Sequence, residues 1–352
     1  MTSATAETTA QLQYTQYGSP LKMVHVPKPA LAPEEVLIRQ RVIALNLIDV
    51  KQRDLGGILI PHWPWVLGIE GAGIIEAVGL DVRGLQPGDE VMAWEGGGAI
   101  AAGVEFFPHG GAYQEHVAVP AFFVGKKPKN ITLQEAASLP ICFVTAVCTI
   151  VNSLKIPLPF LPGLSTDGQA PSSVLVLGGS SVTGAAAIQL LREAYPSLPI
   201  LATSSTKHFA RLHDLGATSV VNYRSPSAVA DIKAASPGAA GVDVIIDCVS
   251  AGASQTDICD VLDPAGSKHY AAVITGVPVP VPEGVTLVDG NAYSMLDMQG
   301  GRQLISSLTK LVEEGKYRVP LPVRVVGHGL EELPNVMDEV KSVSGEKVVV
   351  TL

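Results

Sequence analysis

The chain has 352 residues, of which 47% are hydrophobic and 16% are charged, and its formal net charge is −9 at pH 7. This length accommodates two domains, and the apolar content allows each to bury a core, so disorder over most of the chain is excluded. The acidic balance argues against nucleic acid as a partner, because phosphate neutralisation needs clustered lysine and arginine. No apolar run approaches the ~20 residues that span a bilayer, so no membrane association is expected.

The first part of the chain predicts a flexible tail followed by a β-rich domain. Residues 1–11 are expected to form the tail, because MTSATAETTA is small and polar and lacks the basic start and apolar core of a secretion signal. From 12 to 140 the chain is dense in Gly and Pro and contains short alternating runs such as Glu35–Arg39 and Gly73–Val78. Short strands broken by turns predict a compact, barrel-like β domain.

The most informative stretch is Ser173–Arg192, SVLVLGGSSVTGAAAIQLLR, where an apolar run stops at paired glycines and helical periodicity follows. This pattern predicts a strand, a tight turn and a helix. Gly178 and Gly179 would let the chain reverse, and Gly184 would let the helix pack on the sheet, which brings backbone N–H groups and a helix N-terminus to an anion. The spacing differs from the standard G-x-G-x-x-G fingerprint. We predict a phosphate-binding turn formed by Gly178, Gly179, Ser180, Ser181, Val182, Thr183 and Gly184.

Further apolar runs extend this turn into a second domain, expected over residues 141–315. Four strands are predicted after the first, and a helix over Lys207–Leu215 that stops at Gly216 lies between two of them. The predicted strands are Ile200–Ser204, Ser219–Tyr223, Val242–Cys248 and His269–Ile274. The pattern favours a doubly wound parallel sheet, a Rossmann domain that binds a dinucleotide, over an α/β scaffold that binds no nucleotide.

The end of the chain predicts a return to the first domain. An amphipathic helix is expected over Gln303–Glu314 and closes the second domain. The last segment, 316–352, is expected to hold a strand over Pro322–Val326, a helix near Leu330–Val340 and a final strand over Lys347–Leu352. It is too short to form a domain of its own.

Four cysteines, Cys142, Cys148, Cys248 and Cys259, have neither disulfide-framework nor C-x-x-C spacing. Their largely apolar contexts are typical of small core residues in a reducing compartment. We therefore expect a cytoplasmic protein.

The combination of LGIEGAGIIEAVG, QPGDEV, GGAYQEHVAVP and the glycine turn resembles the medium-chain dehydrogenase/reductase superfamily over nearly the whole chain after the tail. ALNLIDVKQRD, SLPICFVTAV, SVVNYRSP, HYAAV and SGEKVVVTL resemble, within it, the fungal trans-acting enoyl reductases of polyketide biosynthesis. The resemblance implies an α/β architecture with a GroES-like β-rich catalytic domain and a doubly wound Rossmann domain.

The same resemblance implies an enzyme without a metal. Zinc members of the superfamily bind the ion through Cys and His of the first domain. Here Asn46 stands where the first cysteine ligand would be, and Gly68-Ile69-Glu70 replaces the usual Gly-His-Glu. No cysteine precedes Cys142, so the histidines of the first domain have no companion thiolates.

Cofactor choice is predicted from the end of the second Rossmann strand, where an NAD enzyme places Asp or Glu to accept from the ribose 2′-OH. This position holds no acid. Ser204, Ser205 and Lys207 offer hydroxyl donors and a cation to a 2′-phosphate, and Tyr223 matches the tyrosine that faces this phosphate in related quinone and enoyl reductases. The pattern favours NADPH, while Lys207 could also be a solvated lysine at a helix start.

Without zinc to polarise a carbonyl, reduction of an activated alkene is the natural chemistry. The resemblance implies an NADPH-dependent oxidoreductase that reduces the C=C bond of an α,β-unsaturated acyl thioester or ketone, held by a carrier domain or free, with a polyketide synthase as partner. It places Lys51 and Thr145 near the nicotinamide and the substrate carbonyl, with Asn46 as a supporting polar group. Two alternatives stay open: a free-standing quinone or alkenal reductase, and a non-redox cyclase, isomerase or accessory binding protein on the same fold.

Overall fold

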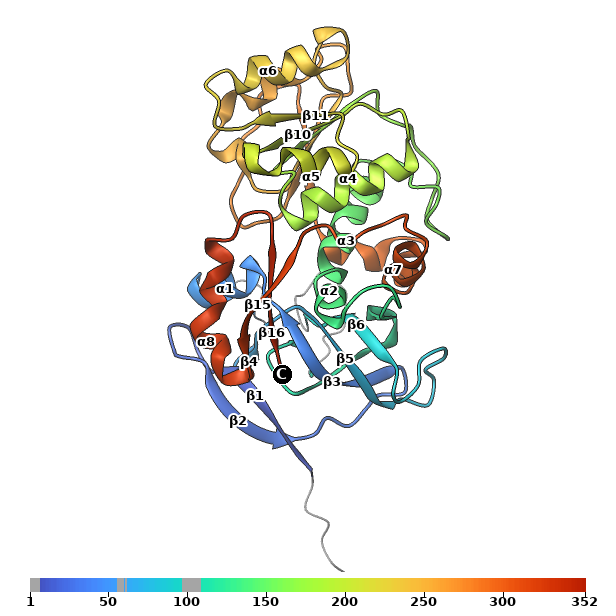
Figure 1. Cartoon of the computed structure of the whole chain (residues 1–352), viewed down its shortest axis with the longest axis vertical. Coiled ribbons are helices and arrows are strands. Elements are labelled where there is room, and N and C mark those ends of the chain that lie inside the picture. Colours follow the sequence, from blue (N-terminus) through green and yellow to red (C-terminus); the bar gives the residue numbers. More distant parts are fainter. Residues whose placement is uncertain (1–6, 56–59, 61, 97–108) are drawn as a thin grey trace, which may run out of the picture. The chain divides into compact units, whose positions relative to one another are not determined.

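The computed structural model describes residues 7–55, 60, 62–96 and 109–352 (Figure 1). The chain divides into two compact units. Unit 1 comprises Met1–Ile141, Ile305–Gly315 and Pro322–Leu352, and unit 2 comprises Cys142–Leu304 and Lys316–Leu321.

Unit 1 is built on two β-sheets. A seven-stranded sheet has the order β15-β16-β3-β5-β6-β8, with β7 paired to β3, and a three-stranded sheet has the order β2-β1-β4. Most neighbours are antiparallel, and β15 and β16 are parallel. The strands are β1 Thr8–Tyr14, β2 Lys22–Pro27, β3 Glu35–Ala44, β4 Trp65–Val66, β5 Glu70–Val78, β6 Glu90–Trp94, β7 His116–Pro120, β8 Val124–Lys126, β15 Val323–His328 and β16 Lys347–Thr351.

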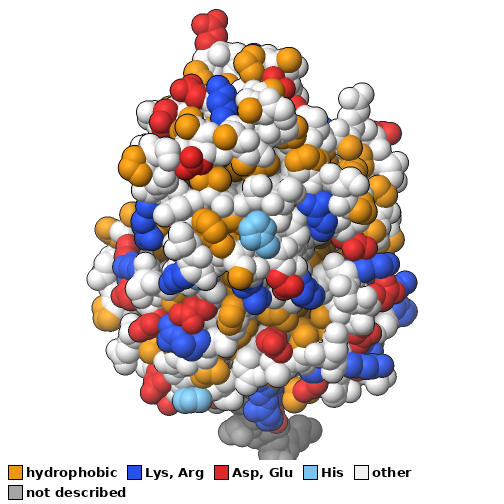
Figure 2. All heavy atoms as spheres, turned by 45° about the horizontal axis from the view of Figure 1, so that its top comes forward, with side chains coloured by type: hydrophobic (Ala, Val, Ile, Leu, Met, Phe, Trp, Pro, Cys, Tyr) orange, Lys and Arg blue, Asp and Glu red, His pale blue; other side chains and the backbone are white. Residues whose placement is uncertain are grey.

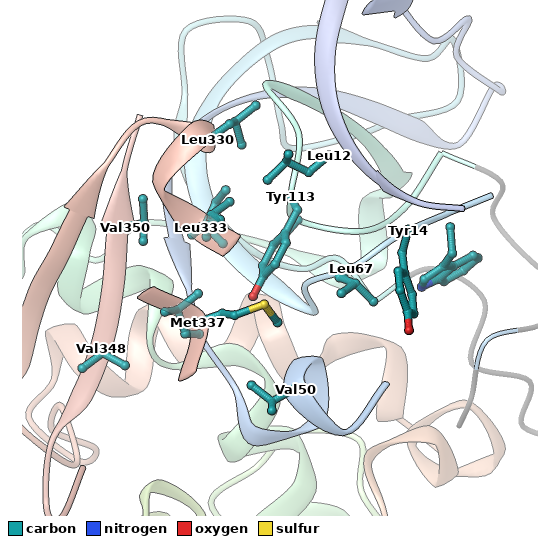
Figure 3. Close-up of a cluster of buried hydrophobic side chains, with 14 of the residues drawn as sticks. Leu12, Tyr14, Val50, Leu67, Tyr113, Leu330, Leu333, Met337, Val348 and Val350 are labelled. Carbon is teal, nitrogen blue, oxygen red and sulfur yellow. The ribbon is translucent and has the colours of Figure 1, made fainter. Parts of the chain in front are cut away.

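A buried apolar cluster joins distant parts of unit 1 (Figure 3). Leu12 and Tyr14 come from β1, Val50 from a helix that follows β3, and Val348 and Val350 from β16. Because alternate residues of a strand point to one face, Val348 and Val350 both reach this core. The last strand of the chain therefore belongs to the core of the first domain, as the sequence predicts.

The helices of unit 1 are short. They are α1 Leu47–Asp54, α2 Leu133–Ala137, α7 Leu304–Glu313 and α8 Leu333–Val336. Helix α3, Pro140–Val147, begins in unit 1 and continues in unit 2 as a π-helical turn, Cys148–Ser153. Within the described residues, no helix is both long enough and apolar enough to cross a bilayer.

Unit 2 is a doubly wound parallel sheet with the order β11-β10-β9-β12-β13-β14, which confirms the predicted fold class. The chain runs outward from β9 to β11, then returns to β12 and runs outward to β14, so the strand order reverses between β9 and β12. The strands are β9 Val174–Leu177, β10 Ile200–Ser204, β11 Ser219–Asn222, β12 Val244–Asp247, β13 His269–Val273 and β14 Thr286–Gly290; the helices are α4 Val182–Ala194, α5 Phe209–Asp214 and α6 Ala228–Ala235.

The division into units differs from the expected boundaries at both ends of the chain. Residues 8–11, expected in the tail, form part of β1, because the N–H groups and carbonyls of this segment pair with β2; residues 1–6 of the expected tail lie outside the described residues. Residues 305–315, expected in the second domain, belong to unit 1. The reason is the packing of α7: Thr309 donates to the carbonyl of Lys126, and Asn130 donates to the carbonyl of Val312.

Candidate functional site

The glycine turn of unit 2 has the geometry that the sequence predicts. Gly178 follows β9 with φ +73°, in the left-handed region that favours glycine. A Cβ at Gly178 would overlap the side chain of Val249, and a Cβ at Gly184 would overlap the carbonyl oxygen of Gly178. Both positions therefore require glycine, one for the turn and one for the close approach of α4 to the turn.

Hydrogen bonds hold this turn against the end of β10. The N–H of Gly178 donates to Thr203 Oγ1 (3.1 Å), and the N–H of Gly179 donates to the carbonyl of Thr203 (2.9 Å). The hydroxyl of Ser204 donates to that of Ser180 (2.9 Å). The turn is thereby preorganised as part of the sheet edge.

Ser181 is the N-cap of α4, and its Oγ accepts from the N–H of Gly184 at 3.0 Å. Val182 and Thr183 are the first two residues of this 13-residue helix. The first N–H groups of an α-helix have no carbonyl partner inside the helix, so those of Val182 and Thr183 can bind an anion.

Ser205, Lys207 and Tyr223 lie at the same edge of the sheet as the turn. Ser204 pairs in register with Asn222, so the residues that follow them, Ser205 and Tyr223, leave neighbouring strands at the same end. Ser205 Oγ is buried and has no hydrogen-bond partner among the described residues, whereas Lys207 is exposed. The guanidinium of Arg224 stacks over the Tyr223 ring at 4.8 Å from its centroid and adds a second cation.

These features fit a dinucleotide. The turn follows β9 and Val249 follows β12, so both lie at the point where the strand order reverses. Val249 is 49% exposed and Tyr223 is 39% exposed. Donors for phosphate beside exposed apolar groups, at the carboxyl ends of parallel strands, are typical of dinucleotide sites.

Unit 1 holds a buried polar triad of Asn46, Glu70 and Lys347. The Lys347 ammonium donates to Asn46 Oδ1 at 2.6 Å and to Glu70 Oε1 at 2.7 Å. Asn46 Nδ2 also donates to Glu70 Oε1, at 3.1 Å. Glu70 is fully buried and Lys347 is 5% exposed.

Asp49, one turn into α1, is a second buried carboxyl close to the triad. Its Oδ2 accepts from the N–H of Asn46 at 2.8 Å and from the Tyr113 hydroxyl at 3.3 Å. Burial raises the pKa of Asp49 to about 7, and the negative charge of Glu70 also raises it, while the Asn46 N–H and the Lys347 charge oppose these effects. Asp49 is therefore partly protonated at neutral pH.

The three predicted catalytic residues lie on two helices. Asn46 is the N-cap of α1, and Lys51 lies within α1, where partial burial lowers its pKa. Thr145 lies on α3 in unit 2, and its side chain is buried. Asn46 is thus brought to the triad, and Lys51 lies five residues further along the same helix.

Among the described residues no group of three or more His, Cys, Asp or Glu side chains is arranged to hold a metal ion. At the position where the resemblance places a first zinc ligand, Asn46 contacts the Lys347 ammonium. The Gly68-Ile69-Glu70 segment supplies Glu70 to the same ammonium.

Four residues described above are not predicted as site residues from the sequence: Glu70, Lys347, Asp49 and Val249. Lys347 and Glu70 each have a visible signal, because a single charged residue opens the apolar run KVVVTL and another opens the small, apolar run EGAGII. That the two meet could not be predicted, since 276 residues lie between them. Val249 has no polar signal at all.

Two family models match the chain. The alcohol dehydrogenase GroES-like domain matches residues 32–129, in unit 1. The zinc-binding dehydrogenase model matches residues 215–345.

Curated relatives match over almost the full length. Dehydrogenase orsE of Emericella nidulans is 30% identical over 96% of this chain and 97% of its own. Trans-enoyl reductase caaB of Aspergillus niger is 31% identical over 92% of this chain and 91% of its own.

Solved structures share the fold. An NAD-dependent alcohol dehydrogenase is 25% identical with a TM-score of 0.74, over 97% of this chain and 99% of that one. The CurK enoyl reductase has a TM-score of 0.76 at 24% identity, over 98% of this chain and 99% of that one.

Proposed function

Because the chain belongs to the medium-chain dehydrogenase/reductase superfamily, we propose that it is an NADPH-dependent, zinc-independent enoyl reductase. Its substrate would be the C=C bond of an α,β-unsaturated acyl thioester or ketone, presented in trans by a carrier domain of a fungal polyketide synthase. The observation that carries the proposal is the match to relatives named trans-enoyl reductases: caaB and pvhC are 31% and 30% identical over more than nine-tenths of both chains.

The preference for NADPH is supported by the end of β10. Ser204 and Ser205 offer hydroxyls, Lys207 offers a cation, and Tyr223 follows the neighbouring strand. The turn 178–184 would hold the pyrophosphate, and these four residues would offer hydrogen bonds and positive charge to the 2′-phosphate. Lys207→Ala should weaken NADPH binding about tenfold and leave NADH binding nearly unchanged. Equal dissociation constants for the two cofactors in the wild-type protein would contradict this part of the proposal.

The bound NADPH would supply the hydride that reduces the β-carbon. Negative charge would then develop on the conjugated carbonyl oxygen, where a hydrogen-bond donor would lower the barrier, and a proton from a side chain or water would reach the α-carbon to complete the reduction. We assign this role to the Lys51 ammonium and the Thr145 hydroxyl, with Asn46 holding the start of α1. The lowered pKa of Lys51, caused by its partial burial, makes its ammonium a stronger proton donor than a solvated lysine.

The proposal is tested by following NADPH absorbance with an enoyl pantetheine thioester, a benzoquinone and a short alkenal. Turnover of the thioester is expected. Lys51→Ala and Thr145→Val should each lower kcat on the order of 10²-fold with little change in NADPH affinity, because the groups act mainly in the transition state. Turnover of the quinone or alkenal alone would replace this function with a free-standing reductase. NADPH binding without turnover of any of the three would favour a non-redox role.

A further inference from the structure

Lys347 is the single lysine or arginine that is buried in the described part of the chain. Its ammonium contacts the side chains of Asn46 and Glu70, which are 24 residues apart in the sequence. Asn46 and Glu70 also bond to each other, so the three side chains close a ring of hydrogen bonds. A closed ring of charge-assisted bonds fixes the positions of its members more strictly than any single bond would.

Each partner of Lys347 also contacts the first turn of a helix. Asn46 is the N-cap of α1, and its own N–H donates to Asp49 in the capping box of that helix. Glu70 uses its second oxygen, Oε2, to accept from the N–H of Ile141 at 3.0 Å, at the start of α3. A buried carboxylate at a helix N-terminus satisfies a backbone N–H that has no partner inside the helix.

Stability alone gives little reason to retain such a triad. Removing two charges from water opposes folding. A protein with apolar residues of the same volume in place of a buried ion pair is often equally stable or more stable. The triad does fix the relative positions of its side chains. An ion pair with two short hydrogen bonds allows one arrangement, whereas an apolar contact allows several.

We propose that Lys347 is a positioning residue: through Asn46 and Glu70 it fixes the first turns of α1 and α3, the helices that carry Lys51 and Thr145. Thr145 lies four residues after Ile141, on the same face of α3, and Lys51 lies five residues after the N-cap Asn46, in the last turn of the eight-residue helix α1. The consequence for catalysis rests on the function proposed above. The effect on the two helices does not.

The test uses three variants. The first is a double variant that carries both Lys347→Met and Glu70→Gln, the second is Lys347→Arg, and the third, Lys310→Met, is the control. The double variant removes both charges, so no uncompensated ion is left in the core. Lys347→Arg keeps the charge but carries it on a planar fork that cannot repeat the two short bonds. Lys310, at 79% side-chain exposure, is a surface lysine of α7.

Hydrogen exchange of the amides in residues 46–54 and 140–147 is measured first, because it needs no activity. Exchange there should rise about tenfold in the double variant and less in Lys347→Arg, while exchange in β9 and β10 and the NADPH dissociation constant stay at wild-type values. With the enoyl thioester, kcat should fall on the order of 10- to 10²-fold and KM should change little. Lys310→Met should match the wild type in every measurement.

Wild-type exchange and wild-type kcat in the double variant would overturn the proposal. A global rise in exchange, with kcat lost in proportion to the folded fraction, would also overturn it, since that pattern describes a purely structural residue. If the double variant does not fold, the hydrogen exchange and kcat of Lys347→Arg are judged against the same two outcomes. If the wild-type protein turns over no enoyl substrate, the proposed function fails, and the exchange measurement still decides whether Lys347 fixes the two helices.

Discussion

At the scale of single residues, three fully buried carboxyls of unit 1 meet three different environments. Glu70 bonds to the Lys347 ammonium. Asp49 accepts only from neutral donors, and one oxygen of Asp49 has no hydrogen-bond partner among the described residues. Glu95 accepts from the Gln40 amide, and burial raises its pKa well above the usual range despite that bond. The one buried ammonium therefore contacts one of the three carboxyls, and burial raises the pKa of the other two.

Asp49→Asn should remove part of the pH dependence of stability. The pKa of Asp49, raised by burial, is about 7 in the folded protein, against roughly 4 in an unfolded chain. Between these two values the folded state holds a proton that the unfolded state has lost, so wild-type stability falls as pH rises through this window. The variant lacks this titration, so its stability relative to wild type should rise by roughly 1 kcal/mol per pH unit from pH 4 to pH 7.

Urea unfolding of both proteins at pH 5 and pH 8 measures this difference. Asp338→Asn is the control: bonds from Arg53 and Lys341 lower the pKa of Asp338 to about 2, so its titration lies below this window. The offset between Asp338→Asn and wild type should be the same at both pH values. A constant offset for Asp49→Asn as well would show that Asp49 is ionised throughout.

Ser205→Ala should separate cofactor binding from stability. Ser205 Oγ is buried without a partner among the described residues, so removing it should leave the melting temperature unchanged or raise it slightly. If the hydroxyl donates to the 2′-phosphate, NADPH affinity should fall about tenfold and NADH affinity should not. Titration of both cofactors by fluorescence checks this. An equal loss of NADH affinity would contradict a contact between Ser205 and the 2′-phosphate.

At the scale of elements, the accuracy of sequence prediction follows burial. Strand β10 is predicted to the residue at Ile200–Ser204, because all five residues are buried and its apolar start, Ile200–Ala202, directly follows a proline. Strand β14, Thr286–Gly290, was not predicted: it lies at the edge of the sheet with most side chains exposed, so it has no apolar run. The helix expected near 330–340 is divided into 3₁₀ turns around the short α8, Leu333–Val336, which has a proline in its first turn.

Gly178→Ala tests whether the turn between β9 and α4 needs glycine for space or only for its backbone angle. The matched control is Gly84→Ala, because Gly84 has a similar φ of +80° and a Cβ there would meet no described atom within 4 Å. The control should lose about 1 kcal/mol from left-handed strain alone. Gly178→Ala should lose several-fold more stability or fail to bind NADPH, because its Cβ overlaps Val249. Equal melting temperatures and retained NADPH binding would show that Val249 can move away.

At the scale of the whole molecule, the path of the chain limits what sequence can predict. The chain passes between the two units after Ile141, Leu304, Gly315 and Leu321. The amphipathic pattern of α7 predicts a buried face but does not say which unit covers it, so the helix was expected in the wrong one. The triad could not be predicted for the same reason, because Asn46, Glu70 and Lys347 meet only when β16 pairs with β3 at the end of the chain.

The surface of the molecule agrees with its composition. On the face in Figure 2, lysine and arginine side chains are interspersed with acidic and apolar ones, without one continuous basic area. With a net charge of −9, long-range attraction of polyanions is weak.

The metal content of the protein tests whether the triad of Asn46, Glu70 and Lys347 takes the place of a zinc site. A bound Zn²⁺ needs three or four nitrogen, sulfur or carboxylate ligands, and at Asn46 and Glu70 the Lys347 ammonium already contacts both side chains. In protein purified without added metal, mass spectrometry should find far less than one zinc ion per protein chain. Reduction of the enoyl thioester should survive EDTA, and added Zn²⁺ should be removed by gel filtration. A tightly held zinc in every chain, with activity lost on chelation, would mean that Lys347 leaves this position and that the two side chains serve the metal instead.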